Sequence, residues 1–229
     1  MSKLKHSHRC NGLVIGAAVG DALGAPFEFE RGGTYAKRFP SPEHGGIGEM
    51  IGGGTFAWLP GEFTDDTQMA LALALSLLEG GGFDPDVTWN YWRNWAYTAK
   101  DIGNTTRHSL SYENWRDVSH SNPESTAANG ALMRAFPLAL LDKSRDELQA
   151  IVLQQGEMTH PHPAARWGAW LGVAMMHSTI HGNNPFATLD EELELLPKDV
   201  AEKFKPLLTP DWGPTARRRR NRSVWVGMG

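Results

Sequence analysis

The sequence predicts an all-α protein. Apolar residues recur at helical spacing along most of the 229 residues, and strand signals are weak. Trp89, Trp92 and Trp95 stand three residues apart, which is more typical of a buried stripe on one helix than of a ligand cage. A hydrophobic share of 41% suffices for a sizeable core. No Ser/Pro/Gly-rich linker divides the chain, so we expect one domain over residues 1–229.

The helices are expected in a definite order. The first contains Gly12, Gly16, Gly20 and Gly24, four residues apart, and ends before Pro26. Because these glycines would share one helical face without side chains, another backbone could approach that face closely. The apolar pattern predicts further helices at about 66–79, 86–99, 127–141, 145–158, 164–181 and 190–205.

Composition narrows the function classes. The formal charge of -4 gives no reason to expect general affinity for nucleic acids. A single cysteine, Cys10, cannot form an internal disulfide, so a reducing cytoplasm is the expected compartment. The Gly-rich loops at 45–46, 52–54 and 80–82 are not followed by Lys-Ser/Thr, and a P-loop nucleotide fold is therefore unsupported. We expect a cytoplasmic monomer.

The N-terminus has some features of a secretory signal. Lys3, Lys5 and Arg9 precede the apolar residues 13–19. Asp21 interrupts the apolar region, so we expect no signal peptide. We also expect no segment long enough and apolar enough to cross a bilayer.

The most informative stretch is Thr64-Asp65-Asp66, which precedes the apolar residues 69–78. Mg²⁺ and Mn²⁺ prefer oxygen ligands, and this stretch offers a hydroxyl and two carboxylates at the start of a buried, rigid helix. The same residues also suit an N-cap and the helix dipole. On this motif alone, capping and metal binding both stay open.

Two further motifs place polar groups at helix ends. Glu28 follows Pro26 in a loop, where a carboxylate can move or can simply be solvated. Asn129 and Gly130 open a helix whose first amides could hold an anionic or polyol ligand, although Asn129 could serve only as a cap.

His160 and His162 flank Pro161 between two predicted helices. Zinc would need a third and a fourth ligand, and no other Cys or His stands at the usual spacing. Zinc ligation by this pair is therefore disfavoured.

Taken in order, these motifs resemble the ADP-ribosylglycohydrolase family. The matching stretches are residues 12–28, which contain G-x-x-x-G-D-A-L-G-A-x-x-E, residues 63–69 (F-T-D-D-T-x-M), residues 129–134 (N-G-A-L-M-R) and Thr159-His160. They cover about the first 180 residues. The resemblance implies a compact, mostly orthogonal bundle of helices with a two-metal Mg²⁺ or Mn²⁺ centre. That centre cleaves the glycosidic bond between ADP-ribose and an acceptor, commonly an arginine side chain.

The resemblance also assigns residues. It implies that Thr64, Asp65 and Asp66 are metal ligands and that Glu28 is a mobile acidic residue, which makes Glu28 and Asp65 the catalytic candidates. The residues implied at the distal ribose and the nucleotide are Asn129, Gly130, Met133 and His160.

The chemistry agrees with this assignment. Cleavage at the ribose anomeric carbon develops oxocarbenium character, which a nearby carboxylate stabilises while a second group activates water. Carboxylates beside cations have lowered pKa values, so Asp65 and Asp66 suit ligation better than proton transfer.

The C-terminal region departs from the family. The family's second metal motif, Gly-Gly-Asp-x-Asp-Ser/Thr, is missing, because Asp211 is the only acidic residue after Lys205. Asp84-Pro85-Asp86 has the Asp-x-Asp spacing of that motif but lies early in the chain, and it suits a loop or a cap better. Residues 221–225 resemble a family segment, Asn-Gly-Ser-Val-Trp, and we expect a chain that is truncated or altered after about residue 210. The arginine run 217–220 suits a solvated tail rather than a nucleic-acid patch.

Three hypotheses follow. The first is a metal-dependent hydrolase that removes ADP-ribose from a modified protein or small molecule, impaired by the missing motif. The second is a catalytically inactive protein that binds ADP-ribose. The third, an all-helical phosphohydrolase, would lead us to expect a His-Asp pair, which the sequence lacks. Neither a membrane nor a nucleic acid is an expected partner.

Overall fold

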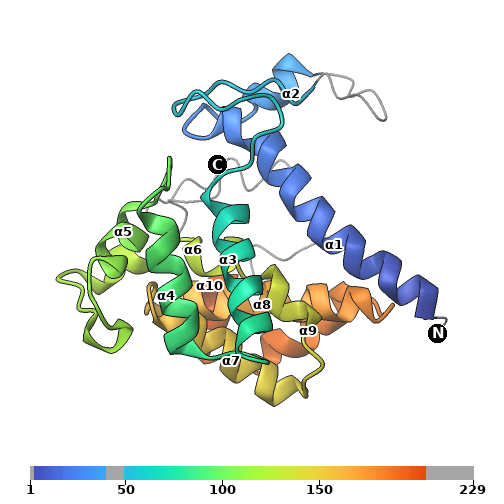
Figure 1. The fold of residues 1–229 in the computed structure, drawn as a ribbon. Helices are drawn as coiled ribbons and strands as arrows, with labels where there is room; N and C mark the ends of the chain where they lie inside the picture. Colours follow the sequence, from blue (N-terminus) through green and yellow to red (C-terminus); the bar gives the residue numbers. More distant parts are fainter. Residues whose placement is uncertain (1–2, 40–48, 205–229) are drawn as a thin grey trace.

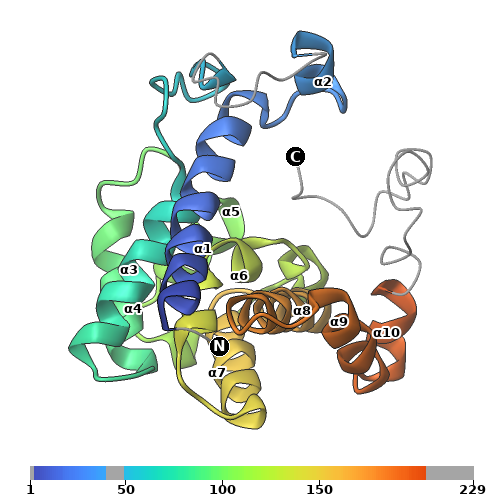
Figure 2. The same cartoon turned by 90° about the vertical axis from the view of Figure 1, so that its right-hand side faces the viewer.

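The computed structural model describes residues 3–39 and 49–204 (Figures 1 and 2). The regular elements of this part are all helices, and it contains no strand, only an isolated antiparallel bridge between Gly53 and Trp58. The all-α prediction is confirmed. The predictions about Asp211, the arginine run 217–220 and residues 221–225 lie outside the described residues.

Ten α-helices and four 3-10 turns follow one another in the described part. They are α1 (Lys3–Gly24), η1 (Ala25–Phe27), α2 (Thr34–Arg38), α3 (Asp65–Glu79), α4 (Pro85–Ala96), α5 (Asn104–Leu110), η3 (Trp115–Asp117), η4 (Pro123–Thr126), α6 (Gly130–Met133), η5 (Phe136–Leu140), α7 (Arg145–Glu157), α8 (Pro163–Ile180), α9 (Pro185–Glu194) and α10 (Lys198–Phe204).

Helix α8 is at the centre of the bundle. It packs against α6, α7, α9 and η5, while α3 and α4 pack against each other on one side (Figure 1). The main core lies between these helices and includes Met69, Trp92, Leu138, Val152 and Trp170, all essentially inaccessible to solvent. The core is therefore assembled from α3, α4, η5, α7 and α8.

Two of the three tryptophans in the predicted stripe of α4 are buried, and Trp95 is partly buried. Trp89 and Trp92 lie in the core, and the indole of Trp92 donates to the backbone oxygen of Met69 at 3.2 Å. Asp84 starts the same helix, because its carboxylate accepts from the amides of Asp86 and Val87 at 2.8 and 3.1 Å. The interpretation of Asp84-Pro85-Asp86 as a cap is confirmed.

Two predicted helices are each broken in two. The expected helix 127–141 is the single turn α6 followed by η5, since Pro137 lacks an amide hydrogen and interrupts the α-helical pattern. The expected helix 190–205 is α9 and α10, separated at Pro197. Helices α2 and α5 were not predicted, because both are short and carry mainly polar residues.

Helix α1 runs diagonally along one side of the bundle, and Figure 2 shows it from another side. A methyl group added to Gly12, Gly16, Gly20 or Gly24 would meet nothing within 4 Å. The close backbone packing expected of these glycines is therefore wrong for the part of the chain that the structure describes.

By length and composition alone, α1 also meets the criterion for a membrane span. Residues Lys5–Phe27 are long and apolar enough to cross a bilayer, and few of them are buried. The expectation that no segment is long and apolar enough was wrong, because the charge of Asp21 does not offset the apolar residues around it. One such helix near an N-terminus is weak evidence, since helices of soluble proteins and signal sequences pass the same test.

Candidate functional site

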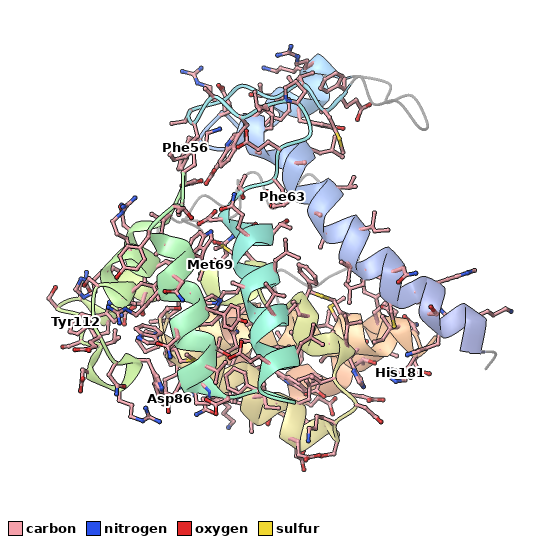
Figure 3. The ribbon with its side chains drawn as sticks, viewed as in Figure 1. Phe56, Phe63, Met69, Asp86, Tyr112 and His181 are labelled. Atoms are coloured by element: carbon pink, nitrogen blue, oxygen red, sulfur yellow. The ribbon has the colours of Figure 1, made fainter. Side chains whose placement is uncertain are left out.

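Five carboxylates from four segments lie near one another where α1 ends and α3 begins. Asp21 lies near the end of α1, Glu28 follows η1, Asp65 and Asp66 form the first turn of α3, and Asp101 precedes α5. Their negative charges act on one another through space. Figure 3 shows the junction, with Phe63 just before α3 and Met69 further along the helix. Three predicted site residues, Glu28, Asp65 and Asp66, are thus brought together.

Asp21 joins α1 to α3. One of its carboxylate oxygens accepts from the amides of Thr64 and Thr67 at 3.0 and 3.1 Å, and from the Thr67 hydroxyl at 2.6 Å. These amides lie at the start of α3, where no carbonyl of the same helix is available to them. Asp21 therefore holds the first turn of α3 in a fixed position. Sequence analysis treated this residue as an interruption of an apolar region and as part of a family motif, without giving it a role in the site.

Thr64 is the N-cap of α3. Its hydroxyl oxygen accepts from the Asp66 amide at 3.3 Å, and its backbone is extended. Thr64 is buried together with Asp65. The capping interpretation is therefore correct. It does not compete with metal binding, because a hydroxyl oxygen has two lone pairs and the cap uses one.

Within the part of the chain that the structure describes, the carboxylates of α3 form no ion pair. Burial, followed by the charge of Asp101, raises the pKa of Asp65 to about 7, although a hydrogen bond from the Gly103 amide opposes the shift. Burial, followed by the charge of Asp65, raises the pKa of Asp66 to about 8. Near neutral pH this site therefore favours the arrival of positive charge, either as protons or as a cation.

The pKa values of Glu28 and Asp101 are raised as well. Burial is the largest cause of the raised pKa of Glu28, followed by the charges of Asp101 and Asp21. Burial also raises the pKa of Asp101, against the opposing effects of the Ile102 amide and Arg107. Sequence analysis did not single out Asp101, because it stands between helices without a motif around it.

The donor chemistry fits Mg²⁺ or Mn²⁺. A hydroxyl and several carboxylates supply only oxygen, which hard cations prefer. Within residues 3–39 and 49–204, no three carboxylate, imidazole or thiol groups are already arranged around one ion position. The two-metal centre stays a prediction.

The residues predicted to border the ribose lie around α6. The backbone oxygen of Asn129 accepts from the amides of Leu132 and Met133 at 2.7 and 3.1 Å, and its side chain makes no capping bond to this turn. The interpretation of Asn129 as a mere side-chain cap is therefore not supported. Because α6 is only one turn long, its amides do not form the longer helix start that the sequence suggested.

Gly130 and His160 lie in direct contact. A methyl group at Gly130 would lie 2.4 Å from the imidazole carbon Cε1 of His160, so only glycine fits beside this ring. His160 is 2% exposed. Its imidazole therefore supports the turn that carries Gly130 and presents little surface to solvent.

A buried arginine connects this turn to the carboxylates. Arg134 is fully buried, and its guanidinium carbon lies 3.9 Å from the centre of the Trp92 ring. Its nitrogens donate to the side-chain oxygen of Gln155 at 3.0 Å and to the Thr159 hydroxyl at 2.6 Å. The Thr159 hydroxyl in turn lies 2.8 Å from Nδ1 of His160. Sequence analysis included Arg134 in a motif without giving it a role.

Burial explains the charge states in this network. It lowers the pKa of Arg134 to about 9, against the opposing charge of Asp65. Burial is also the largest cause of the pKa of His160 lying well below its usual range, followed by the charges of Arg134 and His120. Arg134 is therefore the cation of this region near neutral pH, and His160 is a neutral imidazole.

His162 has a different local role. Its Nδ1 accepts from the Ala164 amide at 3.1 Å, which caps α8, and its Nε2 lies 3.3 Å from Glu124. His160 is engaged with Thr159 instead. The two imidazoles therefore have separate partners, and the expectation that they do not bind zinc stays a prediction.

Comparison with known proteins decides the family. A family model described as ADP-ribosylglycohydrolase matches residues 2–224. The chain belongs to this family. The family resemblance read from the motifs is thereby confirmed.

Individual relatives agree with the family match. The chain is 34% identical over 201 residues to the ADP-ribosyl-[dinitrogen reductase] glycohydrolase of Rhodospirillum rubrum, covering 86% of this chain and 67% of that protein. It is 32% identical over 197 residues to the ADP-ribosylarginine hydrolase Tri1 of Pseudomonas putida, covering 79% of this chain and 49% of that protein. The chain thus spans between about half and two thirds of these relatives.

A solved structure confirms the fold. A chain described as an ADP-ribosylglycohydrolase-related protein complex superimposes with a TM-score of 0.64 at 31% identity. The match covers 93% of this chain and 66% of the other. The arrangement of helices is therefore that of the ADP-ribosylglycohydrolase-related protein.

Proposed function

We propose that this protein is a divalent-cation-dependent hydrolase that removes ADP-ribose from a modified acceptor. The observation that carries the proposal is the group of carboxylates at the start of α3, whose pKa values are raised by burial and by one another's charges. Family membership supports the class of reaction, since the relatives are described as glycohydrolases and an ADP-ribosylarginine hydrolase.

Thr64, Asp65 and Asp66 are the proposed ligands of Mg²⁺ or Mn²⁺. A bound cation would supply electrophilic assistance and orient the ribose hydroxyls. Asp21 keeps the first turn of α3 in place through its bonds to Thr64 and Thr67. The ligands would therefore be presented by a turn that is already fixed, which limits the reorganisation needed on binding.

Glu28 is the proposed acid–base group. Its raised pKa makes a protonated carboxyl available closer to neutral pH than for an ordinary glutamate. It lies on the loop after η1, where a carboxylate can approach or leave the substrate. Asp65 would stabilise the positive charge that develops on the ribose.

Asn129, Gly130 and Met133 are proposed to border the distal ribose, with His160 behind them. The Asn129 amide is available because it does not cap α6. The contact between His160 and Gly130 would fix the backbone of this turn against the nucleotide.

Release of ADP-ribose from an ADP-ribosylated arginine peptide tests the proposal. With Mg²⁺ or Mn²⁺ present, we expect turnover that falls at least about 100-fold in Asp65→Asn/Asp66→Asn, because transition-state stabilisation is lost. Glu28→Gln should lower kcat more than it raises KM. Asp146→Asn, at a carboxylate exposed to 89%, is the matched control and should retain the wild-type rate.

The alternative of an inactive ADP-ribose-binding protein makes a different prediction. It requires that ADP-ribose raises the melting temperature while no peptide, arginine-linked or serine-linked, is cleaved. Under both hypotheses Asn129→Ala should weaken the ADP-ribose shift, whereas Asn183→Ala, at an exposed position after α8, should not. A flat titration up to millimolar ADP-ribose would contradict both.

A further inference from the structure

A row of aromatic side chains lies beside the carboxylates and has no part in the function proposed above. The rings of Phe29 and Phe56 are 6.3 Å apart between their centres, and those of Phe56 and Trp58 are 5.8 Å apart. Both separations are typical of aromatic side chains in contact. Figure 3 labels Phe56 on the loop above the start of α3. We call Phe29, Phe56 and Trp58 the aromatic row.

The aromatic row runs between two of the five carboxylates. At one end, Phe29 directly follows Glu28 in the chain. At the other end, Nζ of Lys100 lies 4.4 Å from the centre of the Trp58 ring, and Asp101 is the next residue. Glu28 and Asp101 are close enough for their charges to act on each other. The aromatic row therefore lies beside the negative charge of the site.

The rings of the row differ in how much solvent they meet. Trp58 is 3% exposed, whereas Phe56 is partly exposed and Phe29 is 72% exposed. Apolar surface that is continuous, rather than scattered over single residues, is typical of a binding site. Phe29 and Phe56 thus leave a pair of aromatic rings accessible to a ligand.

The backbone beneath the row is strained. Among the described residues, positive φ outside glycine occurs at Phe29 (66°) and at Ala57 (50°), which stands between Phe56 and Trp58. Residues with a side chain rarely adopt this left-handed conformation, and it is concentrated where function requires a particular orientation of the chain. The strain motivates the search for a role of the two exposed rings.

One ring of the row already carries a cation. Lys100 lies over Trp58, and its ammonium group also pairs with Glu62 at 3.0 Å. This ion pair is locally neutral, so Lys100 opposes the approach of a second cation only weakly. The face of an aromatic ring attracts ammonium and guanidinium groups, and a guanidinium can also stack on it through its plane. Phe29 and Phe56 offer this kind of surface with more of it exposed.

We propose that Phe29 and Phe56 bind the guanidinium group of the arginine from which ADP-ribose is removed, beside the negative charges of Glu28 and Asp101. Charge complementarity selects this ligand, because a planar cation suits aromatic faces next to carboxylates. A serine acceptor has neither the charge nor the plane. The proposal rests on the function proposed above and specifies its acceptor.

Fluorescence anisotropy of a labelled arginine peptide, titrated with the full chain in the presence of ADP-ribose, tests the row without requiring turnover. A citrulline peptide is the matched ligand, because citrulline has the shape of arginine without its charge. We expect the wild type to bind the arginine peptide at least about threefold more tightly than the citrulline peptide. Phe29→Leu and Phe56→Leu should lose this preference, and Phe29→Tyr, which keeps an aromatic face, should retain it.

Two controls make the test specific. Phe186→Leu changes a phenylalanine of α9 that is 67% exposed and lies outside the row, and it should leave the preference unchanged. Phe29→Leu should leave the ADP-ribose shift in melting temperature unchanged, because the row contacts the acceptor and not the nucleotide. Circular dichroism verifies that each variant is folded.

The outcomes separate this proposal from the proposed function. Equal affinity of the wild type for the two peptides, a preference that survives in Phe29→Leu, or loss of the ADP-ribose shift in that variant would overturn the role of the row. Cleavage of modified peptides would still support the hydrolase in each of these cases. An arginine preference that depends on Phe29 and Phe56, without cleavage of any peptide, would support the row and contradict the hydrolase.

Discussion

Two clusters of buried polar side chains lie near the first turns of α3, one around Arg134 and one at the junction with α1. They differ in how their charges are balanced. Around Arg134, a cation is matched by the oxygens of Gln155 and Thr159 and by the face of Trp92. At the junction with α1, carboxylates stand near other carboxylates and their pKa values rise.

The difference separates scaffold from binding site. A buried group whose hydrogen bonds are complete contributes to a unique fold, whereas buried like charges cost stability until a ligand neutralises them. Arg134 is close enough to act on Asp65 through its charge, yet the oxygens that accept its hydrogen bonds belong to Gln155 and Thr159. Arg134 therefore does not neutralise the carboxylates through hydrogen bonds, and their mutual repulsion lowers the stability of the fold.

The largest loss of stability should come from a substitution at Arg134, whose buried charge is balanced by its neighbours. Arg134→Met removes the cation and leaves the buried oxygens of Gln155 and Thr159 without donors, so we expect a loss of about 3 to 5 kcal/mol in the free energy of unfolding. Chemical denaturation with constant m-value measures it. Arg116→Met is the matched control, because Arg116 also lies over an aromatic ring, that of Trp115, but it pairs with Asp86 and is half exposed. It should cost far less than Arg134→Met, because solvent screens an exposed ion pair, and equal losses would contradict the comparison.

A smaller loss is expected where the scaffold supports the ribose turn. Gly130→Ala forces a methyl group against His160 and should cost about 1 to 3 kcal/mol. It should also weaken ADP-ribose binding in calorimetry, because the turn shifts. Gly12→Ala, in open space on α1, should leave stability unchanged or raise it by up to about 1 kcal/mol. If both substitutions behave alike, the contact with His160 is not what requires glycine at position 130.

A substitution among the carboxylates should raise stability instead of lowering it, and the gain should depend on pH. In the metal-free protein the folded state holds protons on Asp65 and Asp66 that the unfolded state has lost, so these groups lower stability as pH rises from about 4 to about 8. Asp66→Asn should therefore be more stable than the wild type at pH 8, by at least about 1.4 kcal/mol, which corresponds to one pKa unit. The gain should vanish near pH 4, and thermal denaturation at both pH values without metal measures it. A gain that is equal at pH 4 and pH 8 would mean that charge is not its cause.

The sequence was sufficient for the fold class and for the carboxylates of α3. Helical spacing identified α3, α4, α7 and α8, since each buries a long apolar face. It did not divide the segments at Pro137 and Pro197, because apolar residues continue across both breaks. Local pattern thus reports which residues are buried more reliably than where the backbone turns.

The parts of the site that escaped prediction depend on long-range contacts. Asp21 binds residues 43 and 46 positions away, and Asp101 joins the same group from a loop without a motif. Arg134 is far from Trp92 and Asp65 in the sequence, and its burial could not be read from a charged residue in a short motif. Only the folded chain places these groups together.

Calorimetric titration with Mg²⁺ and Mn²⁺ tests the central claim, that the unbalanced carboxylates are a cation site. At pH 8, the wild type and Asp146→Asn should bind with the same affinity, and Asp65→Asn/Asp66→Asn should show no binding heat over the same concentration range. The account predicts this loss because a hard cation needs those carboxylate oxygens. Unchanged affinity in the double variant would contradict it.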